Sequence, residues 1–123
     1  MKKASDIDWS QYTSKQYNDD NYDCLHFACE LYQDITGINI SDDVFVTCPS
    51  TAKRIVNPSK LREYQPLSAP KSPCFALMHR ADGKTHAGVY IDGCIVHLTR
   101  GGLQYLPPHL LATSYPVINY YDR

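Results

Sequence analysis

Three residues of this chain have the types that acyl transfer by a thiol requires. Cys24 follows Asp23 in a run that is typical of a helix start, and His86 and His97 lie in two short β-rich runs further along. The first turn of a helix carries unpaired N–H groups and the positive end of the dipole, which favour a thiolate. The sequence therefore predicts a nucleophilic, thiolate-primed Cys24 with a histidine as its base.

The two histidines are expected to meet on one face of a β-hairpin. Asp92-Gly93 is typical of a two-residue turn, and counting back along both strands puts Gly88 opposite His97, with His86 diagonal to it. Diagonal neighbours have β-carbons roughly 7 Å apart, and a glycine opposite His97 leaves space for a second ring. The opposite face is then wholly apolar: Ala87, Val89, Ile91, Cys94, Val96 and Leu98.

In this arrangement His86 would take the thiol proton and His97 would fix the tautomer of His86. A single strand histidine is more often structural, but two on one face together with a helix-start cysteine favour a catalytic site. His26 should point away from Cys24, because two residues along a helix is nearly the opposite side. No metal or other cofactor is expected, since Cys24 and Cys29 diverge around the helix and the close pairs of a zinc site are missing.

The surrounding pattern predicts a single α+β domain over residues 1–123. Apolar spacing and caps predict a helix over residues 23–35 that Gly37 ends, and short helices are expected from Ser41 and over residues 51–55. After Pro73 the pattern changes to β-rich runs, so an antiparallel sheet follows the helices. These runs cover residues 74–79, 85–91, 94–99, 103–106 and 117–121.

Composition narrows the class of partner. Twelve basic and thirteen acidic residues leave a net charge of −1, with no charged run that would mark a nucleic-acid or anionic lipid surface. No apolar segment is typical of a signal peptide or a membrane span, so synthesis in the cytoplasm is expected. Five cysteines without an export signal argue against a disulfide framework, and Cys29, Cys74 and Cys94 are interpreted as small buried hydrophobes.

Two motifs resemble a known family. Tyr22-Asp23-Cys24 at a helix start, followed by the run HAGVYIDGCIVH over residues 86–97, is similar to the NlpC-type (NlpC/p-sixty) cysteine peptidases, a papain-like group. The resemblance implies a papain-like fold, Cys24 as nucleophile, His86 as base and His97 as the orienting third residue. It also implies a peptidoglycan substrate, cut in the peptide stem between γ-D-glutamate and the diamino acid.

The chain departs from that family at two places. Asp-Cys-Leu-His replaces the usual Asp-Cys-Ser-Gly, and the upstream Tyr-x-Trp-Gly-Gly element is absent, leaving Trp9, Tyr12 and Tyr17 as substitutes. Tyr12, Tyr22 and Asp23 are therefore the expected substrate-binding or oxyanion residues.

The compact form resembles tailed-phage peptidase domains. A phage particle, lysis or contact-dependent secretion would then bring the protein to the wall, with a phage tail or secretion system as partner. Two alternatives stay open: other acyl chemistry on the same fold, and a non-catalytic phage morphogenesis or binding module in which Cys24 is inert.

Overall fold

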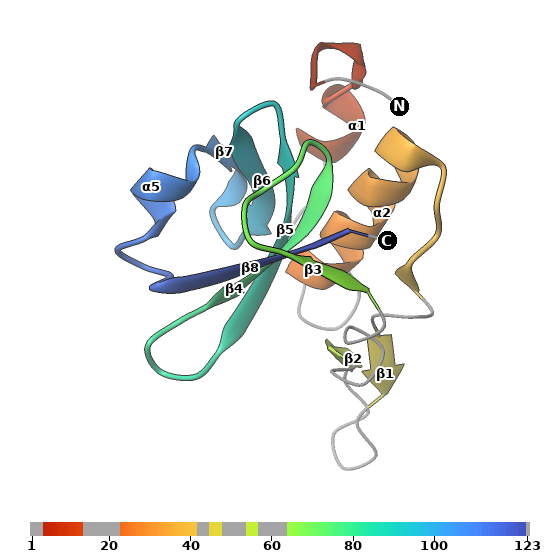
Figure 1. The fold of residues 1–123 in the computed structure, drawn as a ribbon. Coiled ribbons are helices and arrows are strands. Elements are labelled where there is room, and N and C mark those ends of the chain that lie inside the picture. Colours follow the sequence, from red (N-terminus) through yellow and green to blue (C-terminus); the bar gives the residue numbers. More distant parts are fainter. Residues whose placement is uncertain (1–3, 14–22, 42–44, 48–53, 57–63, 123) are drawn as a thin grey trace.

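A computed structural model describes residues 4–13, 23–41, 45–47, 54–56 and 64–122 of the chain (Figure 1). It is an α+β structure in which helices precede an antiparallel sheet. The helical elements are η1 (Ala4–Asp6), α1 (Ser10–Thr13), α2 (Cys24–Thr36) and α5 (Pro108–Leu111). The strands are β1 (Phe45–Thr47), β2 (Arg54–Val56), β3 (Gln65–Leu67), β4 (Cys74–His79), β5 (Thr85–Ile91), β6 (Cys94–Thr99), β7 (Gly102–Leu106) and β8 (Val117–Asp122).

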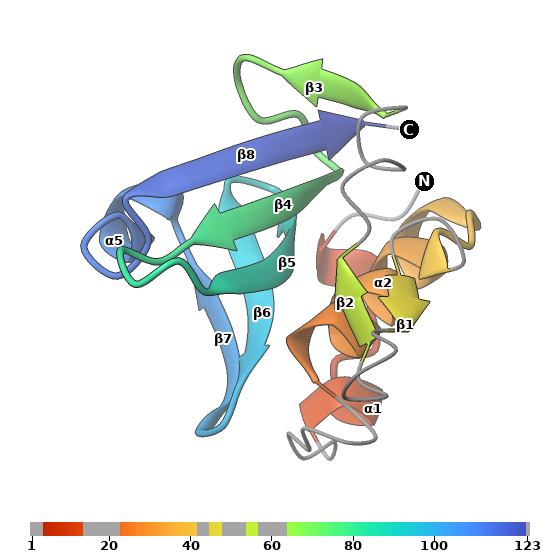
Figure 2. The same ribbon diagram turned by 90° about the horizontal axis from the view of Figure 1, so that it is seen from below.

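The main sheet has the strand order β3-β8-β4-β5-β6-β7, with every neighbouring pair antiparallel. The last strand of the chain thus lies inside the sheet, between β3 and β4. Helices α1 and α2 lie on one side of this sheet and α5 lies on the other, as Figures 1 and 2 show. β1 and β2 form a separate antiparallel pair.

Helix α2 forms where the sequence predicts it. The Asp23 side chain accepts hydrogen bonds from the backbone N–H groups of Leu25 and His26, which satisfies two of the free donors at the helix start. Gly37 ends the helix in the left-handed conformation at φ 77°, and its N–H donates to the Gln33 carbonyl. The inward face is apolar and buried, which holds the first turn of α2 against the sheet.

The β5–β6 hairpin also has the predicted turn. Asp92 and Gly93 both have positive φ, at 51° and 90°, as a two-residue type I′ turn requires, and Ile91 pairs with Cys94. The regular pairing ends at Val89 opposite Val96, three residues before His86. The strand bounds 74–79, 85–91 and 94–99 are confirmed, while β7 and β8 are each one residue longer than predicted.

The two faces of the sheet carry separate apolar clusters. The predicted apolar face of the hairpin packs on α2 in the larger cluster, and of its six residues only Cys94 is not fully buried. The smaller cluster lies on the other face, beneath α5 and beside the two histidines. It contains Ala76, Met78, Ile95 and Leu111, with Tyr90, Leu106, Tyr115, Ile118 and Tyr120 packed against it.

The segment between α2 and β4 differs from expectation. A helix over residues 51–55 is wrong for Arg54 and Ile55, which belong to β2 and pair with β1. Residues 51–53 lie outside the described residues, as do residues 42–44 of the helix expected from Ser41. Strand β3 was not predicted, because three residues that include Pro66 give no readable alternation. In the described part of the chain, no helix has the length and apolarity that crossing a membrane requires.

Candidate active site

Cys24 is the first residue of α2 and is partly buried against β5. Burial raises the pKa of the thiol, and hydrogen bonding from the Ala87 backbone to the sulfur acts against this effect, as does the backbone at Cys24 and Leu25. Ala87 directly follows His86 in β5. The helix start therefore brings the sulfur to the part of β5 that carries the predicted base.

His86 and His97 form one hydrogen-bonded pair. His86 Nε2 lies 2.7 Å from His97 Nδ1, and the two rings are nearly perpendicular, with centroids 4.8 Å apart. This confirms that the hairpin puts both imidazoles on one face of the sheet. The bond uses Nε2 of His86 and leaves its Nδ1 outside the pair.

Gly88 makes this pairing possible. A β-carbon built on Gly88 would lie 2.8 Å from the Val96 carbonyl oxygen, 2.9 Å from Ile95 Cγ2 and 3.2 Å from His97 Cβ. The two strands thus approach each other too closely at this point for any side chain. The sequence predicted that Gly88 leaves room for a second imidazole ring. In the structure, the backbone of β6 and Cβ of His97 lie in that room.

Cys24 and His86 share their surroundings. The Tyr115 ring stacks on the His86 ring with centroids 5.6 Å apart and an angle of 12°. Burial raises the pKa of Tyr115, and a negative charge on Cys24 would raise it further. A negative charge on Asp23 favours protonated His86. The Tyr115 ring therefore lies against the histidine pair, and the charges of Asp23 and Cys24 at the start of α2 act on these rings.

Burial keeps Cys24, His86 and His97 uncharged in the resting protein at neutral pH. It raises the pKa of the Cys24 thiol to about 11. The charge of Asp23 also raises this pKa, and the backbone hydrogen bonds act in the opposite direction. Burial likewise lowers the pKa of His86 to about 4, helped by His97, and lowers that of His97 to about 4. The expected thiolate priming by the helix start is wrong for this structure, because the loss of solvation outweighs the backbone donors at the helix start.

The neutral pair has a defined tautomer if His86 is to accept a proton at Nδ1. Its Nε2 must then carry hydrogen and donate to His97 Nδ1, so the His97 proton is on Nε2. His97 is only 1% exposed, and no described residue makes a hydrogen bond to its Nε2. Gln104 lies directly opposite His97 in β7, and its amide acts to favour the charged form of His97.

Of the residues expected to bind substrate, the structure describes Tyr12 and Asp23. Tyr12 is 1% exposed and its hydroxyl donates to Asp34 at 3.0 Å, which places it in the core; its expected role in substrate binding stays a prediction. The Asp23 carboxylate caps α2 and accepts from two backbone N–H groups, which leaves it a structural role at the site. Tyr22 and Tyr17 lie outside the described residues.

The other described histidines have separate environments. His26 Nδ1 lies 2.8 Å from Asp23 Oδ1, which keeps this ring at the helix cap as expected of a residue that is not the base. His79 Nε2 lies 3.1 Å from the Asn119 amide nitrogen, and His109 is exposed on α5.

Within the described part of the chain, no disulfide is formed by Cys24, Cys29, Cys74 or Cys94. Cys29 and Cys74 are buried as predicted, whereas Cys94 is partly exposed. Within the described ranges, no group of three or more His, Cys, Asp or Glu side chains is placed to hold a metal ion.

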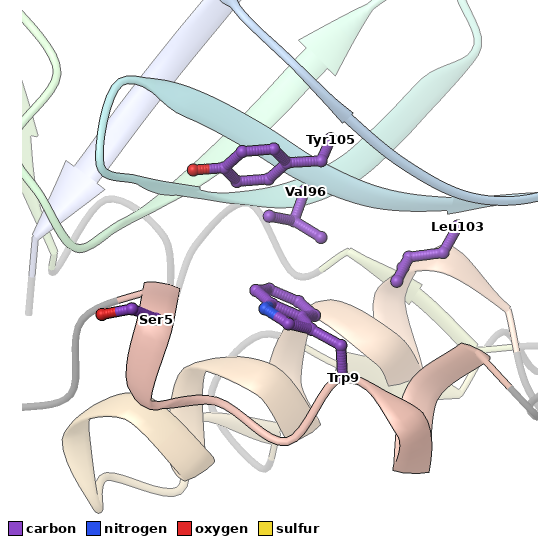
Figure 3. A pocket seen from close by; sticks show the side chains of 5 residues that line it. All are labelled: Ser5, Trp9, Val96, Leu103 and Tyr105. Atoms are coloured by element: carbon purple, nitrogen blue, oxygen red, sulfur yellow. The ribbon is translucent and has the colours of Figure 1, made fainter.

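A cavity of about 420 Å³ lies on the α2 side of the sheet, between the N-terminal segment and β6–β7 (Figure 3). Trp9, one of the residues expected to substitute for the aromatic element of the NlpC-type family, faces Tyr105 there, with ring centroids 6.2 Å apart. None of Cys24, His86 and His97 lines it. The lining residues are Ser5, Trp9, Val96, Leu103 and Tyr105.

The site contains two groups that sequence reasoning missed. Tyr115 follows the turn after α5, and Gln104 lies in β7; neither belongs to a recognisable motif. The register of β6 with β7 would have indicated Gln104, since residues opposite each other share a face. Comparison with known proteins found no matching family model, no matching curated protein and no matching solved structure.

Proposed function

We propose that this protein is a cysteine hydrolase with a papain-like, NlpC-type fold, which cleaves an amide bond through a thioacyl intermediate. The proposed substrate is the peptide stem of bacterial peptidoglycan. One observation supports the chemistry above all others: the 2.7 Å bond between His86 Nε2 and His97 Nδ1. The helix-start cysteine meets β5 at the backbone of Ala87, the residue after His86. Nucleophile, base and orienting group are the three parts that such a reaction needs.

The neutral resting state defines the first step. As the Cys24 sulfur bonds to the substrate carbonyl carbon, its proton passes to His86 Nδ1. The resulting imidazolium then gives that proton to the leaving amine as the C–N bond breaks, which leaves a thioester on Cys24. Water attacks the thioester while His86 takes one of its protons; the carboxylic acid leaves, and the proton returns to the sulfur.

His97 and the helix start assist these steps. Hydrogen bonding of His86 Nε2–H to His97 Nδ1 keeps the other nitrogen of His86 free to accept the thiol proton. Charge that develops on the sulfur is stabilised by the backbone at Ala87, Cys24 and Leu25, which acts to lower the thiol pKa. A developing oxyanion beside the sulfur would use the same end of the helix.

The substrate class rests on the motif around Cys24 and on the run from His86 to His97. The same residues support acyl transfer if an acceptor other than water attacks the thioester, so the acceptor distinguishes a hydrolase from a transferase. Delivery to the wall by a phage particle, by lysis or by contact-dependent secretion belongs to the same proposal.

Digestion of purified peptidoglycan, with mass analysis of the released fragments, tests the activity and identifies the bond. We expect wild type to release stem-peptide fragments and Cys24→Ala to release none, since the variant removes only the sulfur. Cys29→Ala is the matched control, because Cys29 is a buried cysteine on the same helix. Equal digestion by wild type and Cys24→Ala, with both folded, would contradict the catalytic role.

A second candidate, a non-catalytic binding module, is favoured by one observation: burial raises the pKa of Cys24 to about 11, as in an inert thiol. Such a module would sediment with insoluble peptidoglycan equally well as wild type and as Cys24→Ala, and neither protein would release fragments. Fragment release by wild type alone rejects this candidate.

A further inference from the structure

The Tyr115 ring stacks on His86, the predicted base, although no motif in the sequence links the two residues. It follows the short helix α5 and precedes β8, and its backbone N–H donates to the Leu111 carbonyl at 2.8 Å, which fixes the turn. The side chain is partly buried and packs against the smaller apolar cluster. The ring is therefore held by the fold on the same face of the sheet as the histidine pair.

Two ring contacts define its position. The ring is nearly parallel to His86, at 12° with centroids 5.6 Å apart, and nearly perpendicular to His97, at 89° with centroids 6.3 Å apart. An offset parallel contact covers one face of the imidazole with the electron-rich face of the tyrosine ring. Rotation of His86 away from His97 would lose that contact.

The charge that forms during the reaction makes this contact more than a packing contact. His86 must become an imidazolium when it takes the thiol proton, and a cation over an aromatic face is stabilised by the ring quadrupole. The other charged or titratable groups that act on His86 are His97 from β6, Asp23 before α2, and Arg80 after β4. Of these three, only Asp23 favours the cation.

We propose that Tyr115 is a positioning residue of this site: its ring holds the His86 imidazole against His97 and stabilises the positive charge that His86 gains during acyl transfer. This role rests on the proposed function for its catalytic meaning. This role depends on the face of the Tyr115 ring, and it does not require the Tyr115 hydroxyl.

Two substitutions and one control separate this role from packing. Tyr115→Phe keeps the ring and Tyr115→Leu removes it. Tyr120→Leu is the matched control: Tyr120 is a partly buried tyrosine at the same apolar cluster, but its ring contacts Tyr90 edge to face, with centroids 5.9 Å apart. Thermal unfolding of each variant establishes that it is folded at the temperature of the measurements.

Nuclear magnetic resonance of ¹⁵N-histidine-labelled protein gives a readout that needs no substrate. We expect wild type at pH 7 to show His86 as a single tautomer with hydrogen on Nε2, and Tyr115→Leu to show averaged tautomer signals. Loss of the cation–π contact should also lower the pKa of His86, by about 0.4 to 1.5 pH units. With a starting value of about 4, a one-unit shift reduces the protonated fraction at pH 4 from about half to about a tenth.

In the peptidoglycan assay, Tyr115→Leu should lower kcat about tenfold with little change in KM, because the charge forms in the transition state. Tyr115→Phe and Tyr120→Leu should resemble wild type in both experiments. Identical His86 spectra in wild type and Tyr115→Leu would overturn the proposal, and so would a Phe variant that behaves like the Leu variant. If wild type has no activity, the proposed function fails, and the histidine spectra still decide whether Tyr115 positions His86.

Discussion

Gly88→Ala perturbs the site without removing any of its functional groups. The added β-carbon would lie 2.8 Å from the Val96 carbonyl oxygen and 3.2 Å from His97 Cβ, well inside the roughly 3.5–4.0 Å at which carbon atoms pack best. The nearest obstacle is backbone, so it cannot rotate away, and β6 must shift by several tenths of an ångström. Overpacking of this kind costs about 1–3 kcal/mol of unfolding free energy.

Urea and thermal unfolding measure this cost directly. For a domain of this size, we expect a fall in Tm of about 3–5 °C for each kcal/mol. The shift of β6 also moves His97 away from His86, so kcat should fall about tenfold to a hundredfold. Loss of activity should therefore exceed the loss that partial unfolding explains at the assay temperature.

Gly101→Ala is the matched control. A β-carbon at Gly101 meets only Thr99 Oγ1, at 3.7 Å, which is ordinary contact, and we expect a stability change within about 0.5 kcal/mol. Equal stability of the Gly88 and Gly101 variants would refute the close approach of β5 and β6. A destabilised Gly88→Ala that keeps the wild-type kcat would refute the link between this approach and the histidine pair.

Three further predictions concern the histidines. His86→Ala should reduce kcat nearly as much as Cys24→Ala, by about 10² to 10⁴. His97→Gln should reduce kcat less, because the amide oxygen can still accept a hydrogen bond from His86. Steady-state kinetics that show the reverse order would exchange the two roles. Both histidine pKa values are lowered to about 4, so below pH 6.5 the unfolded chain binds more protons than the folded chain. The free energy of unfolding should therefore fall as the pH decreases from 6.5 to 4, by up to about 3 kcal/mol per histidine. Urea titrations at several pH values should show a smaller fall for His97→Gln. Gln104→Leu removes the amide that acts to favour the charged form of His97, so it should lower stability by about 1 kcal/mol and also lower kcat, while Gln104→Glu should retain both. Unchanged stability and kinetics of the Leu variant would exclude a role of Gln104 at His97.

Local sequence was sufficient for the elements that hold the three predicted catalytic residues. Asp23 and Gly37 delimit α2 through contacts within a few residues, and Asp92-Gly93 fixes the hairpin through positive φ angles. Since side chains alternate along a strand, the turn also determined that His86 and His97 share a face. These features depend on neighbours in the chain, which a sequence displays directly.

The rest of the site depended on contacts between distant segments. Tyr115 reaches His86 because β8 is inserted between β3 and β4, and no local pattern encodes that insertion. Tyr12 is in the core because its hydroxyl meets Asp34 on α2, a contact across 22 residues. The protonation of Cys24 was decided in the same way: the helix start is visible in the sequence, but the packing that removes water from the thiol and raises its pKa is a property of the folded chain.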